Sequence, residues 1–128
     1  MIEVEVENRS GIMVDAAGAV ALARHALGEE GVADAELGIA FVAPDEIRAL
    51  KAEHLGIDEA TDVLSFPIDG LEELPEGVPR ALGDVVICPQ VVGDEWRWPL
   101  VHGILHLLGF DHGEVMEHRE REILEAAG

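Results

Sequence analysis

Three of the six histidines in this sequence fall in one short stretch, at positions 102, 106 and 112. His102 and His106 are four residues apart, so on a helix their side chains lie on one face, one turn apart. Two imidazoles at this spacing can direct nitrogen atoms to one point at the zinc–nitrogen distance of about 2.0–2.1 Å. Gly109 can adopt a positive φ, end the helix and turn the chain back, so that His112 supplies a third ligand. The spacing therefore predicts one Zn²⁺ ion per chain, held by three histidines.

A zinc site with three protein ligands keeps one position open for water, which is typical of catalytic rather than structural zinc. The other positions of the predicted helix are apolar, namely Val101, Ile104, Leu105, Leu107 and Leu108. Such a helix is expected to be buried, and two buried histidines need partners. The competing interpretation is that these are ordinary core or surface histidines. Their spacing around a suitably placed glycine favours the metal.

The same spacing occurs in the long metalloprotease motif H-E-x-x-H-x-x-G-x-x-H, where the glutamate is the general base. Gly103 stands at that position here, so we expect a metal site but no peptidase, and we name no general base. A glycine inside a helix costs roughly 1 kcal/mol relative to alanine. Its presence predicts either close backbone approach or room for a substrate at Gly103.

The elements that must position these histidines can be predicted from hydrophobic periodicity and from glycine and proline signals. Strands are expected over 2–6, 37–42, 62–66 and 82–88, and helices over 15–27, 44–54, 98–108 and 113–127, with a loop over 68–80. This partial alternation predicts an α+β fold, with a small mixed sheet of about four strands, packed helices and a metzincin-like zinc helix. At 128 residues, the chain is expected to form a single domain over residues 1–128.

The composition is strongly acidic, with 8 Lys and Arg against 27 Asp and Glu and a formal net charge of -19. Such a field repels phosphate backbones, so composition alone argues against a nucleic-acid partner and favours a role of the acids in solubility. No apolar run approaches the ~20 residues of a membrane span, and the N-terminus has acids where a signal peptide has basic residues. The single cysteine, Cys88, cannot form an internal disulfide and reads as a small buried apolar residue. We expect a cytoplasmic protein.

Residues 102–112, HGILHLLGFDH, resemble the signature of a bacterial rRNA maturation factor family, the YbeY endoribonucleases. Residues 61–67, TDVLSFP, resemble the family's other signature, and residues 82–88, LGDVVIC, resemble a third recurrent segment. The resemblance covers nearly the whole chain. It implies an α+β fold, zinc on the three histidines, processing of ribosomal RNA precursors and ribosome quality control.

Two departures from the family pattern stand out. Many members have Tyr-Arg-Gly where this chain has His54-Leu55-Gly56, and that arginine is implicated in the nuclease activity. Leu55 cannot hydrogen-bond to phosphate or stabilise charge in a transition state. The segment from Pro89 to Leu100 also looks shorter than usual, which predicts that the helix before the zinc helix is reduced or lost.

Two functional hypotheses follow from the residues and the resemblance together. The first is a zinc-dependent single-strand endoribonuclease that matures ribosomal RNA, at the 3' end of the small-subunit rRNA, and acts in ribosome quality control. The second is a non-catalytic, zinc-stabilised ribosome-assembly factor, favoured by Leu55 and by the net charge of -19. The expected partners in both are ribosomal RNA or ribosomal particles, with neither membrane nor DNA.

Several other residues have two readings. Asp111 either orients a ligand histidine or caps a turn, and Asp62 and Ser65 either line a cleft or satisfy the backbone at a strand end. Trp96 and Trp98 can stack on bases, although packing under the zinc helix is favoured. The remaining polar candidates are expected at the surface: His25, His54, His118, and Arg119 and Arg121 in pairs with Glu117, Glu120 and Glu122.

Overall fold

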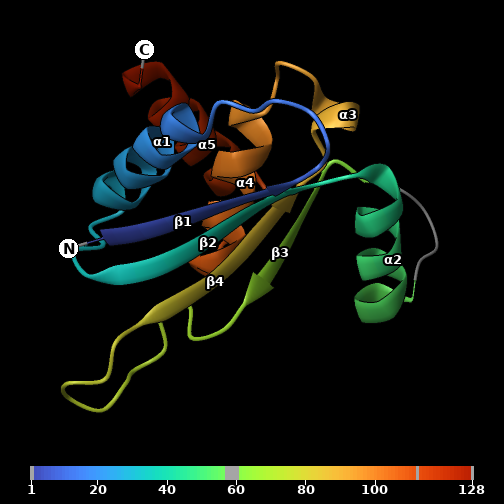
Figure 1. Cartoon of the computed structure of the whole chain (residues 1–128). Helices are drawn as coiled ribbons and strands as arrows, with labels where there is room; N and C mark the ends of the chain where they lie inside the picture. Colours follow the sequence, from blue (N-terminus) through green and yellow to red (C-terminus); the bar gives the residue numbers. More distant parts are fainter. Residues whose placement is uncertain (1, 57–60, 112, 128) are drawn as a thin grey trace.

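The computed structural model of the chain describes residues 2–56, 61–111 and 113–127 (Figure 1). Its elements in chain order are β1 (Ile2–Arg9), α1 (Ala16–Glu29), β2 (Ala35–Val42), α2 (Pro44–Leu55), β3 (Val63–Pro67), β4 (Ala81–Ile87), α3 (Pro89–Val92), α4 (Arg97–Leu107) and α5 (Glu114–Ala126). The order of strands and helices predicted from the sequence is confirmed, with ends that differ by a few residues.

The four strands of the described residues form one mixed sheet in the order β1-β2-β4-β3. Strands β1, β2 and β4 run parallel, whereas β3 pairs antiparallel with β4, with Val63 opposite Ile87 and Pro67 opposite Gly83. The helix α1 connects the parallel neighbours β1 and β2, as a crossover between parallel strands requires. The predicted α+β class with a small mixed sheet is confirmed.

Apolar side chains cover both faces of the sheet, with a larger cluster on one face and a smaller one on the other. The larger core joins one face of the sheet to α1, α4 and α5, which lie together in Figure 1. A smaller cluster around Ile47 of α2 covers part of the other face. The alternation in β1 explains its half-buried character, because Ile2, Val4 and Val6 turn towards the larger core. Buried Cys88 lies in the smaller cluster, as expected.

The helix α4 is the centre of the larger core. Leu100, Val101, Ile104 and Leu105 are fully buried, and the helix contacts β3, β4, α1 and α5. This burial confirms the prediction from its apolar sequence and fixes the two histidines of α4 in a rigid frame. Within the described residues, no helix combines the length and apolarity needed to cross a bilayer.

A cross-helix ion pair holds α5 against the end of α1. Arg119 Nε donates to Glu30 Oε2 at 2.9 Å, and its guanidinium also contacts Glu122 at 3.1 Å. The hydrogen bond to Glu30 raises the pKa of Arg119. Arg119 therefore makes the local pair predicted with Glu122, and it also pairs with Glu30, which directly follows α1.

The segment before α4 is short, as predicted. Its helix α3 spans only the four residues Pro89–Val92. Gln90 fixes this segment to the loop after β1 by donating from Nε2 to the carbonyl of Ser10 at 2.7 Å.

Candidate functional site

The side chains of His102 and His106 lie side by side on α4, as their spacing predicts. Their Nε2 atoms are 3.1 Å apart, and their rings are nearly perpendicular, with centroids 4.6 Å apart. Both residues are half-buried, so the pair sits at the boundary between the core and the solvent.

The other nitrogen of each ring contacts an acceptor. His102 Nδ1 lies 2.5 Å from Glu120 Oε1, and His106 Nδ1 lies 2.9 Å from the backbone carbonyl oxygen of Phe110. A carbonyl only accepts, so His106 carries a proton on Nδ1, and the carboxylate of Glu120 favours the same tautomer in His102. In the neutral tautomers, the two Nε2 lone pairs then face each other. A shared cation, either a proton or a metal ion, stabilises such a pair.

The donor set fits a metal ion. Two nitrogen ligands of a tetrahedral zinc ion are about 3.3 Å apart when each zinc–nitrogen distance is about 2.05 Å. The observed separation of 3.1 Å between the Nε2 atoms is close to this value. Ligand histidines usually donate their second N–H to a carboxylate or a carbonyl, and both kinds of acceptor are present.

The third predicted ligand, His112, lies outside the described residues. Among those that the structure does describe, no group of three or more metal-binding side chains comes together. Asp111 is exposed. An orienting contact from Asp111 to His112 would also fall outside the described part, so both expectations stay predictions.

Gly109 ends the histidine helix in the predicted way. Its φ is +96°, a conformation that side-chain-bearing residues rarely adopt, and its N–H donates to the carbonyl of His106 at 3.0 Å. The reversal brings the carbonyl of Phe110 back to the ring of His106. The local turn therefore orients one histidine of the pair through a backbone carbonyl.

Close backbone approach explains Gly103. A Cβ at this position would lie 2.7 Å from Val85 Cγ1 and 3.0 Å from Ser65 Oγ, and Ser65 Oγ donates to the Gly103 carbonyl at 2.9 Å. Of the two alternatives from the sequence, the structure supports tight packing of α4 on β3 and β4. A glutamate, as in the proteases, would clash here.

An open cleft of about 480 Å³ borders the histidine pair, lined by Leu55, Asp62, Val63, Leu64, Ser65, Pro67, His102 and His106. Leu55 is the last residue of α2 and is 59% exposed. Asp62 serves both predicted roles, because it lines the cleft and its Oδ1 accepts from the N–H of Val63, the first residue of β3, at 2.9 Å. Ser65 lines the cleft, but its Oγ donates to the Gly103 carbonyl of α4 and not to backbone at a strand end. The cleft joins residues from α2, β3 and α4.

Sequence reasoning missed Glu120. Its side chain is buried, with the residue 4% exposed, and it accepts from His102 and, at 3.1 Å, from Nε1 of Trp98. The expectation of a surface pair is wrong for this residue. The spacing of Met116, Glu120 and Ile123 carries the missing signal, because all three occupy the buried face of α5.

The two tryptophans differ. Trp96 packs against the larger core, as favoured from the sequence. Trp98 is 45% exposed and stacks on the ring of His102, with ring centroids 4.8 Å apart, so the packing expected for it is wrong. Of the histidines expected at the surface, His54 and His118 are exposed and His25 is half-buried.

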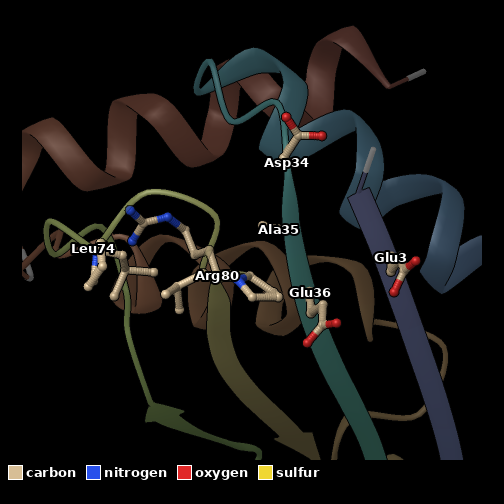
Figure 2. Close-up of a pocket in the computed structure, with 9 residues that line it drawn as sticks. Glu3, Asp34, Ala35, Glu36, Leu74 and Arg80 are labelled. Atoms are coloured by element: carbon tan, nitrogen blue, oxygen red, sulfur yellow. The ribbon is translucent and has the colours of Figure 1, made fainter.

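Another hollow, of about 490 Å³, lies at the start of β1 and β2 (Figure 2). Figure 2 shows Glu3 and Glu36 on these neighbouring strands, with Asp34 just before β2 and Arg80 beside the loop that carries Leu74. Arg80 donates to the carbonyl of Gly70 at 2.7 Å. None of the predicted site residues lines this hollow, so the histidine cleft is the candidate site.

Fold and site define a class: a mixed α/β protein with a His-x-x-x-His pair on a buried helix, open to a cleft. The family model described as "Endoribonuclease YbeY" matches residues 5–128, and the chain belongs to this family. The Endoribonuclease YbeY of Salinispora tropica is 39% identical, over 98% of this chain and 92% of the relative. Those of Beutenbergia cavernae and Nocardia farcinica are 42% and 37% identical, over 91% and 98% of this chain and 87% and 77% of theirs.

The fold also matches a solved structure. The solution structure of TM1509 from Thermotoga maritima superposes with a TM-score of 0.58 and 25% sequence identity, over 99% of this chain and 89% of the other. The resemblance seen in the three sequence segments is therefore confirmed at the level of the family and the fold.

Proposed function

We propose that this protein is a zinc-dependent endoribonuclease that cleaves single-stranded ribosomal RNA precursors in the cytoplasm. The observation that carries the proposal is the histidine pair, with Nε2 atoms 3.1 Å apart and both Nδ1 atoms held by acceptors. Family membership supports RNA cleavage, because the relatives are named endoribonucleases.

In this proposal, His102, His106 and His112 hold one zinc ion. When bound, zinc supplies Lewis-acid activation of water and of the scissile phosphate. Glu120 and the carbonyl of Phe110 lie against the Nδ1 atoms of the first two histidines, which favours the tautomer that presents Nε2 as the metal ligand. The cleft between Leu55 and the pair is where the RNA strand would lie.

The second candidate is a ribosome-assembly factor in which the metal stabilises the fold. Two observations favour it. Leu55 exposes an apolar side chain to the cleft where a phosphate would need a cation, and the net charge is -19. In this case binding to ribosomal particles would be the function, and ribosome quality control would follow from binding alone.

Cleavage of a labelled ribosomal RNA precursor separates the two candidates. The native protein is compared after zinc loading and after chelation, beside His106→Ala loaded in the same way. We expect cleavage only by the zinc-loaded native protein. Equal background cleavage in all three samples, with native binding to ribosomal particles retained, would favour the assembly factor instead.

A further inference from the structure

A second hollow adjoins the histidine cleft. It has a volume of about 420 Å³ and is lined by Asp62, Val91, Val92, Glu95, Trp98 and Pro99. Asp62 lines both this hollow and the histidine cleft, and Trp98 stacks on His102. The hollow therefore lies next to the proposed site of cleavage.

The walls of this hollow combine exposed apolar surface with a rigid aromatic ring. Trp98 is 45% exposed and Val91 is 51% exposed. The ring of Trp98 is held by stacking on His102 and by the hydrogen bond from its Nε1 to Glu120. An exposed ring that is already fixed loses little side-chain entropy on binding, which suits it to stack against a flat ligand.

Of the described residues that line the hollow, two have carboxylates and none has a basic side chain. Asp62 uses Oδ1 for the N–H of Val63, and Glu95 is exposed. Two carboxylates repel phosphate and accept hydrogen bonds from N–H groups. A ligand for this hollow therefore needs a flat apolar face and N–H donors. In an RNA strand, the group that has both is the nucleobase.

We propose that this hollow is a base-binding subsite of the RNA strand, and this inference rests on the proposed function. Trp98 stacks on the base, while Asp62 or Glu95 accepts from its Watson–Crick edge. Guanine fits best, because it presents two adjacent N–H groups to one carboxylate. Uracil fits worst, because its single N–H is flanked by two carbonyl oxygens that the carboxylate repels.

The charge of the chain supports recognition through bases. With only 8 basic residues in the sequence, few phosphates can be neutralised. Stacking and hydrogen bonds to unpaired bases act without that neutralisation and are the usual means of recognising single strands. A base subsite beside the histidine pair would thus place a nucleotide with the preferred base next to the cleaved bond.

The test measures binding of four hexaribonucleotides, in which uridine alternates with guanosine, adenosine, cytidine or a second uridine. The protein is zinc-loaded and carries Trp96→Phe, so that Trp98 is its only tryptophan and reports binding by fluorescence quenching. Anisotropy of labelled oligonucleotides serves as the readout for Trp98→Leu. A gel of each sample records cleavage separately, and zinc content is measured for every variant.

We expect the guanosine oligonucleotide to bind about tenfold more tightly than oligouridine. Trp98→Leu should weaken binding of all four about tenfold, and Glu95→Gln with Asp62→Asn should remove the preference for guanosine. Glu117→Gln removes the same charge from an exposed position on α5 and is the matched control for Glu95→Gln. The control should keep the preference.

Different experimental results would refute the base subsite and the proposed endoribonuclease. Equal affinity for all four oligonucleotides, unchanged by Trp98→Leu, would overturn the subsite and leave the surface of Val91 and Trp98 to a protein contact. Base preference in a protein that does not cleave the ribosomal RNA precursor after zinc loading would refute the endoribonuclease and keep the subsite. Cleavage that depends neither on the base nor on Trp98 would refute the subsite and keep the endoribonuclease.

Discussion

Glu120 offers the sharpest test of how the histidine pair is organised. Its carboxylate is buried and accepts from His102 Nδ1 at 2.5 Å and from Trp98 Nε1 at 3.1 Å. Glu120→Gln keeps an acceptor of nearly the same shape but removes the charge. Glu120→Ala removes the acceptor and leaves two donors without their partner. The two variants therefore separate the charge of Glu120 from its hydrogen bonds.

Typical magnitudes for buried contacts of this kind give the expected size of both effects. Removing a carboxylate that orients a ligand histidine typically lowers metal affinity about 10- to 100-fold. A charge-assisted hydrogen bond is roughly twice as strong as a neutral one. Glu120→Gln keeps a neutral hydrogen bond, so its loss of zinc affinity should be about 10-fold, whereas that of Glu120→Ala should be about 100-fold. These factors correspond to about 1.4 and 2.7 kcal/mol of binding free energy. Glu120→Ala should also lower the free energy of unfolding by about 1–3 kcal/mol, because buried donors lose their acceptor.

Competition with a chromophoric chelator measures zinc affinity, and urea unfolding of the metal-free proteins measures stability. Glu117→Gln is the control, since Glu117 is exposed on the same helix. Zinc affinities of Glu120→Gln and Glu120→Ala that match the control would refute the reasoning. In that case the short contact to His102 would have only a structural role.

Gly103→Ala should lower the free energy of unfolding in urea by about 1–2 kcal/mol, because its Cβ meets Val85 Cγ1 at 2.7 Å; Gly28→Ala, with no atom near its Cβ, should raise it by up to about 1 kcal/mol. Equal changes would contradict the packing argument. Elemental analysis should find one zinc per native chain and far less in His106→Ala; metal absent even after refolding with zinc would contradict the site. The log–log salt slope of binding to bare RNA should be shallow, about 0.7 per phosphate contact, and a steep slope would reveal a clustered basic face.

The parts of the site that depend on local rules were predictable from the sequence. The spacing of His102 and His106 and the positive φ of Gly109 depend on helix geometry and on glycine chemistry. The α+β fold also followed, because alternating apolar residues, Pro44 and the glycine after α2 mark most element boundaries. The short α3 was expected from segment length.

The residues that the sequence could not place depend on how distant elements pack. The spacing of the buried residues of α5 places Glu120 on the inward face, but its contact with His102, 18 positions earlier, depends on the packing of α5 on α4. The exposure of Trp98 and its stacking on His102 likewise depend on the short segment that leads into α4. The reason for Gly103 needed the position of Val85 on β4, which no local pattern reveals. Contacts between elements, and not local propensity, decide which polar residues support the site.

The central claim, that the histidine cleft cleaves RNA, is tested most directly at Leu55. This side chain lines the cleft with His102 and His106 and is 59% exposed, so Leu55→Arg can be accommodated without repacking the core. A donor that stabilises developing charge typically contributes about 10²–10³ in rate. The measurement is the single-turnover cleavage rate of a ribosomal RNA precursor by zinc-loaded native protein, Leu55→Arg, the uncharged control Leu55→Met, and His106→Ala. We predict slow cleavage by the native protein and Leu55→Met, a rate raised by at least about tenfold in Leu55→Arg, and none in His106→Ala. The same rate in all four proteins would contradict the claim.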